Sequence, residues 1–135
     1  MKILSTLLIL GAVITVAYWL NYFLAGDVRV LPDYWYSAFE DSFPTADGWM
    51  AFTMLLAGIG LWRGRREGAL FGLMAGSALI YLAAMDITFN IEHGLYALLP
   101  KSGPMLTETI INATSLGLGI ATLLASWRRA LRGTF

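Results

Sequence analysis

The sequence contains no cysteine and only one histidine, His93. Without thiols the chain can form no disulfide, no thiolate metal site and no dithiol redox centre. A single histidine also excludes a histidine-rich zinc site or a bis-histidine haem within one copy. The chain is therefore neither a disulfide-stabilised scaffold nor a cysteine-based membrane oxidoreductase.

Charge is scarce as well. Charged residues make up 13% of the 135 residues, against about 25% in an ordinary soluble domain. Hydrophobic residues make up 58%, and the mean hydropathy is +0.66. The nine basic and nine acidic residues cancel, so the net charge does not indicate a nucleic-acid partner. This composition predicts an integral membrane protein with a single domain over residues 1–135.

Four apolar runs are long enough to be membrane spans, at about 3–24, 45–62, 69–96 and 105–127. A helix advances about 1.5 Å per residue, so roughly 20 residues cross the hydrocarbon core. The first run is too long for the apolar region of a secretory signal, and no clear A-x-A cleavage site follows it. Mostly short connections then predict an all-α, four-helix transmembrane bundle with up-down topology.

The basic residues are distributed unevenly over the predicted spans. Seven of the nine fall on one predicted side of the membrane: Lys2, Arg63, Arg65, Arg66, Arg128, Arg129 and Arg132. The positive-inside rule places this side, with both termini, in the cytoplasm. Compactness and the arginine-marked inner side favour a bacterial-type inner membrane, with the chain as a multi-pass protein of the cell membrane.

The connection 26–44 is the only long one, and it is acidic and aromatic. Pro32 is suited to the first position of a short helix. We predict an interfacial helix in this first extracytoplasmic loop, lying over the outer end of the bundle. It serves either as a lid over a polar cluster or as a connector that rests on the membrane.

The third span begins as an apolar helix and ends in polar residues. Asp86, Asn90 and His93 are spaced i, i+4, i+7, which places them on one helix face. An ionisable group inside a span costs a few kcal/mol, so its default interpretation is a functional or paired residue. The alternative is that these residues sit at the level of the lipid headgroups, where water solvates them.

Glycines recur every fourth residue at the start of this span, at positions 68, 72 and 76. Two overlapping G-x-x-x-G steps in an apolar helix indicate close contact with another helix. The partner is either another helix of the same chain or a second copy, so the Gly68/Gly72/Gly76 face is a possible homo-oligomer contact.

The fourth span carries a stripe of polar and small residues along one face: Glu108, Asn112, Ser115, Gly119, Thr122 and Ser126. The lower part of the stripe suits helix packing in lipid. Glu108 and Asn112 lie about 5 and 10 Å from the outer end of the span, level with the polar end of the third span. Asp47, in the first turn of the second span, lies at a similar height.

The sequence therefore predicts one polar cluster at the outer end of the bundle. Its ligand-binding residues are Asp86, Asn90, His93, Glu108, Asn112 and Asp47. A divalent cation is a possible cofactor, because calcium takes carboxylate and amide oxygens and zinc prefers histidine with carboxylates. The candidate metal ligands are Asp86, His93 and Glu108, although their spacing matches no known metal loop.

We interpret the chain as a small polytopic membrane protein whose outward-facing polar pocket binds a cation or a polar-headed small ligand without catalysis. The first alternative is a membrane-embedded enzyme that uses the carboxylate and histidine cluster on a lipid-soluble substrate. No G-x-S-x-G or H-E-x-x-H motif accompanies it. An oligomeric ion or proton conductor comes next, followed by a purely structural hydrogen-bond network between helices.

Overall fold

The computed structural model describes residues 1–26 and 29–132, and this part of the chain is all-α. It is 85% helical with no strand among the described residues, which confirms the all-α part of the predicted fold class. The α-helices are α1 (Lys2–Leu24), α2 (Tyr34–Glu40), α3 (Pro44–Trp62), α4 (Arg66–Glu92) and α5 (Gly103–Arg132). A short 3-10 helix, η1 (Leu95–Leu98), lies between α4 and α5.

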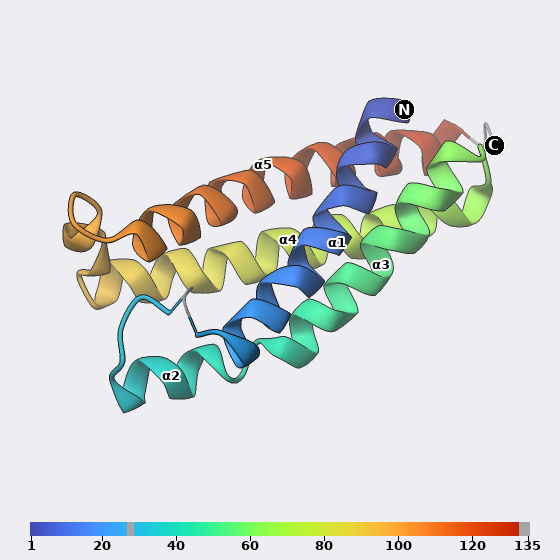
Figure 1. Cartoon of the computed structure of the whole chain (residues 1–135). Helices are drawn as coiled ribbons and strands as arrows, with labels where there is room; N and C mark the ends of the chain where they lie inside the picture. The colour runs from blue at the N-terminus through green and yellow to red at the C-terminus, as the bar shows by residue number, and fades with distance from the viewer. Residues whose placement is uncertain (27–28, 133–135) are drawn as a thin grey trace.

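The four long helices pack in the order in which they follow one another along the chain. α1 packs against α3, α3 against α4, and α4 against α5. The N-terminus, the turn from α3 to α4 and the last turn of α5 lie at one end of the molecule (Figure 1). α2 and the turn from α4 to α5 lie at the opposite end, which we call the outer end.

Three helices are long and apolar enough to cross a membrane: Lys2–Leu24, Arg66–Glu92 and Gly103–Arg132. They make the chain a membrane protein, in agreement with its many exposed large apolar side chains, such as Leu20 and Ile110. The fourth predicted span, α3, has 19 residues, or about 28 Å. It is not among these three helices, so the four-span bundle stays a prediction.

Glycines allow the helices to approach closely. A Cβ atom added to Gly68 on α4 would collide with the backbone of Gly60 on α3. One added to Gly76 would lie 2.9 Å from the carbonyl oxygen of Gly119 on α5, and one added to Gly72 would collide with Ser126. The Gly68/Gly72/Gly76 face is thus buried against the chain's own helices, and a homo-oligomer through it stays an untested prediction.

The ends of two predicted spans differ from the structure. The third span was expected to reach Tyr96, but α4 ends at Glu92, because Gly94 adopts the left-handed conformation with φ 65°. A glycine that takes a positive φ just after the last turn is a common helix stop. The fourth span was expected to end at Trp127, whereas α5 continues for five more residues to Arg132.

Candidate functional site

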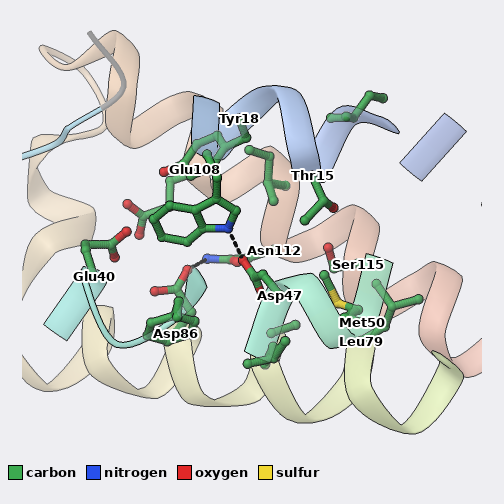
Figure 2. Close-up of a pocket in the computed structure, with 16 residues that line it drawn as sticks. Thr15, Tyr18, Glu40, Asp47, Met50, Leu79, Asp86, Glu108, Asn112 and Ser115 are labelled. Carbon is green, nitrogen blue, oxygen red and sulfur yellow. Dashed lines mark hydrogen bonds between the residues drawn. The ribbon is translucent and has the colours of Figure 1, made fainter. Parts of the chain in front are cut away.

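Four carboxylates from four different helices line one pocket near the outer end. Glu40 comes from α2, Asp47 from α3, Asp86 from α4 and Glu108 from α5. Figure 2 shows these side chains gathered around one space, with Tyr18 of α1 beside them. Residues separated by as many as 68 positions, 40 to 108, thus form a single constellation.

The cavity is partly open to the surface and is about 90 Å³ in volume. A cavity needs about 15 Å³ on this measure to hold one water, so this one has room for roughly six waters or a compact ligand head group. The polar side chains that line it are Thr15, Tyr18, Trp19, Glu40, Asp47, Asp86, Glu108, Asn112 and Ser115. Among the described residues, no lysine, arginine or histidine lines it.

Neutral donors satisfy three of the four carboxylates. The indole N–H of Trp19 donates to Asp47 Oδ2 at 2.7 Å, and the side-chain amide of Asn112 donates to Asp86 Oδ2. Glu108 accepts two hydrogen bonds, from the Tyr36 hydroxyl at 2.9 Å and from the Asn90 amide. Hydrogen bonds position these groups, but no cationic side chain of the pocket lining neutralises them.

Local sequence explains how the carboxylates reach the pocket. Asp47 lies in the first turn of α3, where Pro44 occupies a starting position and a carboxylate is favoured by the helix dipole. Tyr36 and Glu40 are four residues apart on α2, so they share a face, and they are the two buried residues of that helix. α2 therefore turns a polar face to the pocket.

Glu40 differs from the other three carboxylates. Its side chain is only 6% exposed. The nearby Tyr36 hydroxyl donates to Glu108 and also forms a hydrogen bond with Glu40, which partly offsets the rise in the Glu40 pKa. Burial, followed by the negative charges of Asp86, Glu108 and Asp47, raises the pKa of Glu40 to about 8. This carboxyl is therefore mostly in its neutral form at pH 7.

The structure brings together four of the six predicted ligand-binding residues: Asp47, Asp86, Glu108 and Asn112 all line the pocket. Asn90 is fully buried beside them and holds Glu108, but it does not line the cavity. Asn90 therefore belongs to the site as a residue that positions Glu108.

His93 lies outside the pocket, contrary to the sequence prediction. It follows the last residue of α4, is exposed, and stacks on Trp35 with ring centroids 4.9 Å apart. Its Nδ1 atom lies 2.9 Å from the carbonyl oxygen of Phe89. The helix face that was extrapolated through Asp86 and Asn90 ends before this residue, so the imidazole turns away from the carboxylates.

The predicted metal set of Asp86, His93 and Glu108 is not assembled, because His93 is elsewhere. Over residues 1–26 and 29–132, no group of three or more histidine, cysteine, aspartate or glutamate side chains is arranged to hold a metal ion. The geometry gives no support to a divalent cation as the ligand.

Two aromatic residues of the site are not among the residues predicted from the sequence. Trp19 is buried and bonds to Asp47. Tyr36 was not singled out, although its i, i+4 spacing from Glu40 marks a shared face. α2 also stacks on α4, since the rings of Phe39 and Phe89 lie 3.7 Å apart between centroids.

Comparison of the chain with protein-family models, with curated proteins and with solved structures finds no match.

Proposed function

We propose that the chain spans the membrane four times, with α3 as the fourth span and both termini in the cytoplasm. Seven basic residues support this orientation, since they belong to the end of the molecule that holds the N-terminus and the α3–α4 turn. The four carboxylates lie toward the opposite end. The pocket then faces the extracytoplasmic side of a bacterial-type inner membrane, with α2 as an interfacial helix across its outer end.

We further propose that this pocket binds a small, positively charged, polar-headed ligand without catalysis. One observation carries the proposal: four carboxylates surround one cavity whose described lining contains no basic side chain. Like charges in a low-dielectric site repel and hold one another protonated. A cation in the cavity would remove that repulsion, and the N–H groups of an ammonium would donate hydrogen bonds to the carboxylate oxygens.

The other interpretations receive less support. The enzyme alternative depended on a histidine beside the carboxylates, and His93 is exposed outside the pocket. The conduction alternative needed a wet path along α5, but Thr122 and Ser126 are fully buried, and Ser126 packs against Gly72. A purely structural network gains only about 0.6 kcal/mol per interhelical polar pair, which is little benefit for burying four carboxylates.

The test is ligand-dependent thermal melting of the full chain in detergent. The probes are ethylammonium, sodium, magnesium, calcium and zinc salts, with ethanol as the neutral control. We expect ethylammonium to raise the melting midpoint of the wild type, because a ligand that binds only the folded state stabilises it. Asp86→Asn should abolish this rise.

The matched control is Glu92→Gln, which removes a carboxylate from an exposed position on the same helix. This variant should respond to ethylammonium as the wild type does. The proposal fails if no cation raises the wild-type midpoint, or if ethanol and ethylammonium act equally.

A further inference from the structure

The pocket has an opening on one side, between α1 and α5. Ile14 of α1 and Ile111 of α5 both line the cavity, yet Ile14 is 60% exposed on the outer surface of its helix. A side chain can do both only where the cavity reaches that surface. We call the gap between Ile14 and Ile111 the lateral mouth.

The other helix seams are closed by glycine contacts. Gly60 meets Gly68 between α3 and α4, and Gly76 meets Gly119 between α4 and α5. Between α1 and α3, a Cβ added to Gly58 would lie 2.9 Å from the carbonyl oxygen of Ser5. Within the described residues, α1 and α5 have no comparable backbone approach. Below the mouth the two helices meet through Leu118 beside Gly11.

The depth of the mouth differs from the depth of the carboxylates. At about 1.5 Å per residue, Asp47, Glu108 and Asp86 lie roughly 5, 8 and 9 Å from the outer ends of their helices. Ile111 and Ile14 lie about 12 and 15 Å from the outer ends of theirs. In the proposed four-span orientation, the lateral mouth therefore faces the acyl-chain region of the bilayer, below the level of the charged groups.

The aromatic and acidic lining specifies the head group that fits. Tyr18, Trp19 and Phe43 line the same cavity as the carboxylates, and aromatic faces attract an ammonium as carboxylates do. A phosphate-bearing head group is disfavoured, since it would meet four carboxylates and no basic side chain of the described lining. The space of about 90 Å³ fits a compact amine.

We infer that the ligand is a membrane-resident, single-chain alkyl amine without an anionic group. Its ammonium head lies among the carboxylates, and its tail leaves through the lateral mouth into the bilayer. This inference rests on the proposed cation-binding function, and it adds the chemical class of the ligand and its route of entry. This arrangement explains why Ile14 is exposed at the lateral mouth. It also explains why the mouth lies deeper than the carboxylates.

Native mass spectrometry of the purified full chain tests the inference. The probes are dodecylamine, ethylamine, dodecanol and a single-chain phosphoethanolamine lipid. We expect one dodecylamine per chain, and no comparable adduct with dodecanol or the phospholipid. Asp86→Asn should weaken binding of both amines by about thirtyfold, because it removes one partner of a buried charge pair.

The mouth is tested with two neighbouring residues of α5. Ile111→Trp fills the opening and should weaken dodecylamine binding by about tenfold, with ethylamine binding retained. Ile110→Trp is the matched control, because Ile110 is 57% exposed and does not line the pocket. If Ile111→Trp does not fold, Ile14→Trp closes the mouth from α1, with Val13→Trp as its control.

The outcomes separate the two proposals. Equal binding of dodecylamine to Ile111→Trp and Ile110→Trp overturns the lateral route. Binding of ethylamine with no preference for dodecylamine, or equal binding of dodecanol, overturns the ligand class. If the wild type binds neither amine, the cation-binding function itself fails.

Discussion

At the scale of single residues, the environment of Glu40 favours its neutral form, which a bound cation would ionise. Its neutral form is favoured at pH 7, because its pKa is raised to about 8 from an ordinary value of 4.5, chiefly by burial. The charges that surround it come from three other helices, at Asp47, Asp86 and Glu108. Binding of an ammonium would favour the carboxylate form and release a proton.

Glu40 should make stability depend on pH. A carboxyl whose pKa is higher in the folded state destabilises the fold as pH rises from its unfolded value, about 4.5, to its folded value, about 8. The loss is up to about 5 kcal/mol, at 1.4 kcal/mol for each pKa unit. The melting midpoint of the wild type should therefore fall across this window, and Glu40→Gln should make the fall less steep.

The control for this titration is Glu92→Gln, whose curve should keep the wild-type slope because Glu92 is exposed. Melting is followed by circular dichroism in buffers of constant ionic strength. Parallel curves for the wild type and Glu40→Gln would show that this carboxyl does not titrate in the window.

At the scale of elements, α2 is held to the rest of the molecule by its aromatic and polar side chains. Phe39 stacks on Phe89 of α4, and the Tyr36 hydroxyl bonds to Glu108 of α5. At its end, Asp41 accepts a hydrogen bond of 3.0 Å from Tyr22 of α1. A helix of seven residues is too short to be stable alone, so these contacts determine its position over the pocket.

Loss of the aromatic stack should loosen α2 without unfolding the long helices. Phe39→Ala removes a ring pair that contributes about 0.5–1.5 kcal/mol beyond its buried area. Backbone amides of 34–41 should then exchange with deuterium about tenfold faster, since local opening becomes less costly. Hydrogen-exchange mass spectrometry measures this, and exchange in α4 should stay unchanged.

Tyr34→Ala serves as the control within α2, because Tyr34 is 87% exposed. Equal exchange in 34–41 for both variants and the wild type would mean that the stack does not hold the helix.

The helices and the site could be predicted only in part from the sequence. Apolar run length predicted the long helices, and the i, i+4 spacings of Asp86 with Asn90 and Glu108 with Asn112 predicted which faces meet. His93 does not line the pocket, because the helix stop at Gly94 interrupts the pattern. The sequence pattern does not place Glu40 in the pocket, since the orientation of α2 depends on a tertiary contact, Phe39 on Phe89, that no local pattern encodes.

At the scale of the whole molecule, small residues determine how closely the long helices pack. Gly68 faces the backbone of α3 with no room for a Cβ atom, whereas a Cβ added to Gly117 on α5 would meet nothing within 4 Å. Both glycines lie inside long helices. Their substitution by alanine therefore separates the cost of lost contact from the effect of helix propensity.

Gly68→Ala should destabilise the protein by about 1–3 kcal/mol, because the backbones of α3 and α4 must move apart. Gly117→Ala should be neutral or stabilise the helix by up to about 1 kcal/mol. Reversible unfolding in mixed detergent and denaturant measures both. Equal stabilities of the two variants would contradict the close packing of α3 on α4.

Packing between consecutive helices has a consequence for synthesis. Each of α3, α4 and α5 packs on the long helix that precedes it in the chain, so each can dock as it leaves the ribosome and enters the membrane. The pocket is different, because its last carboxylate, Glu108, and one wall of its mouth arrive only with α5. A nascent chain that has released α1 to α4 is already largely helical but lacks Glu108, so the ligand binding that we propose requires insertion of the last helix.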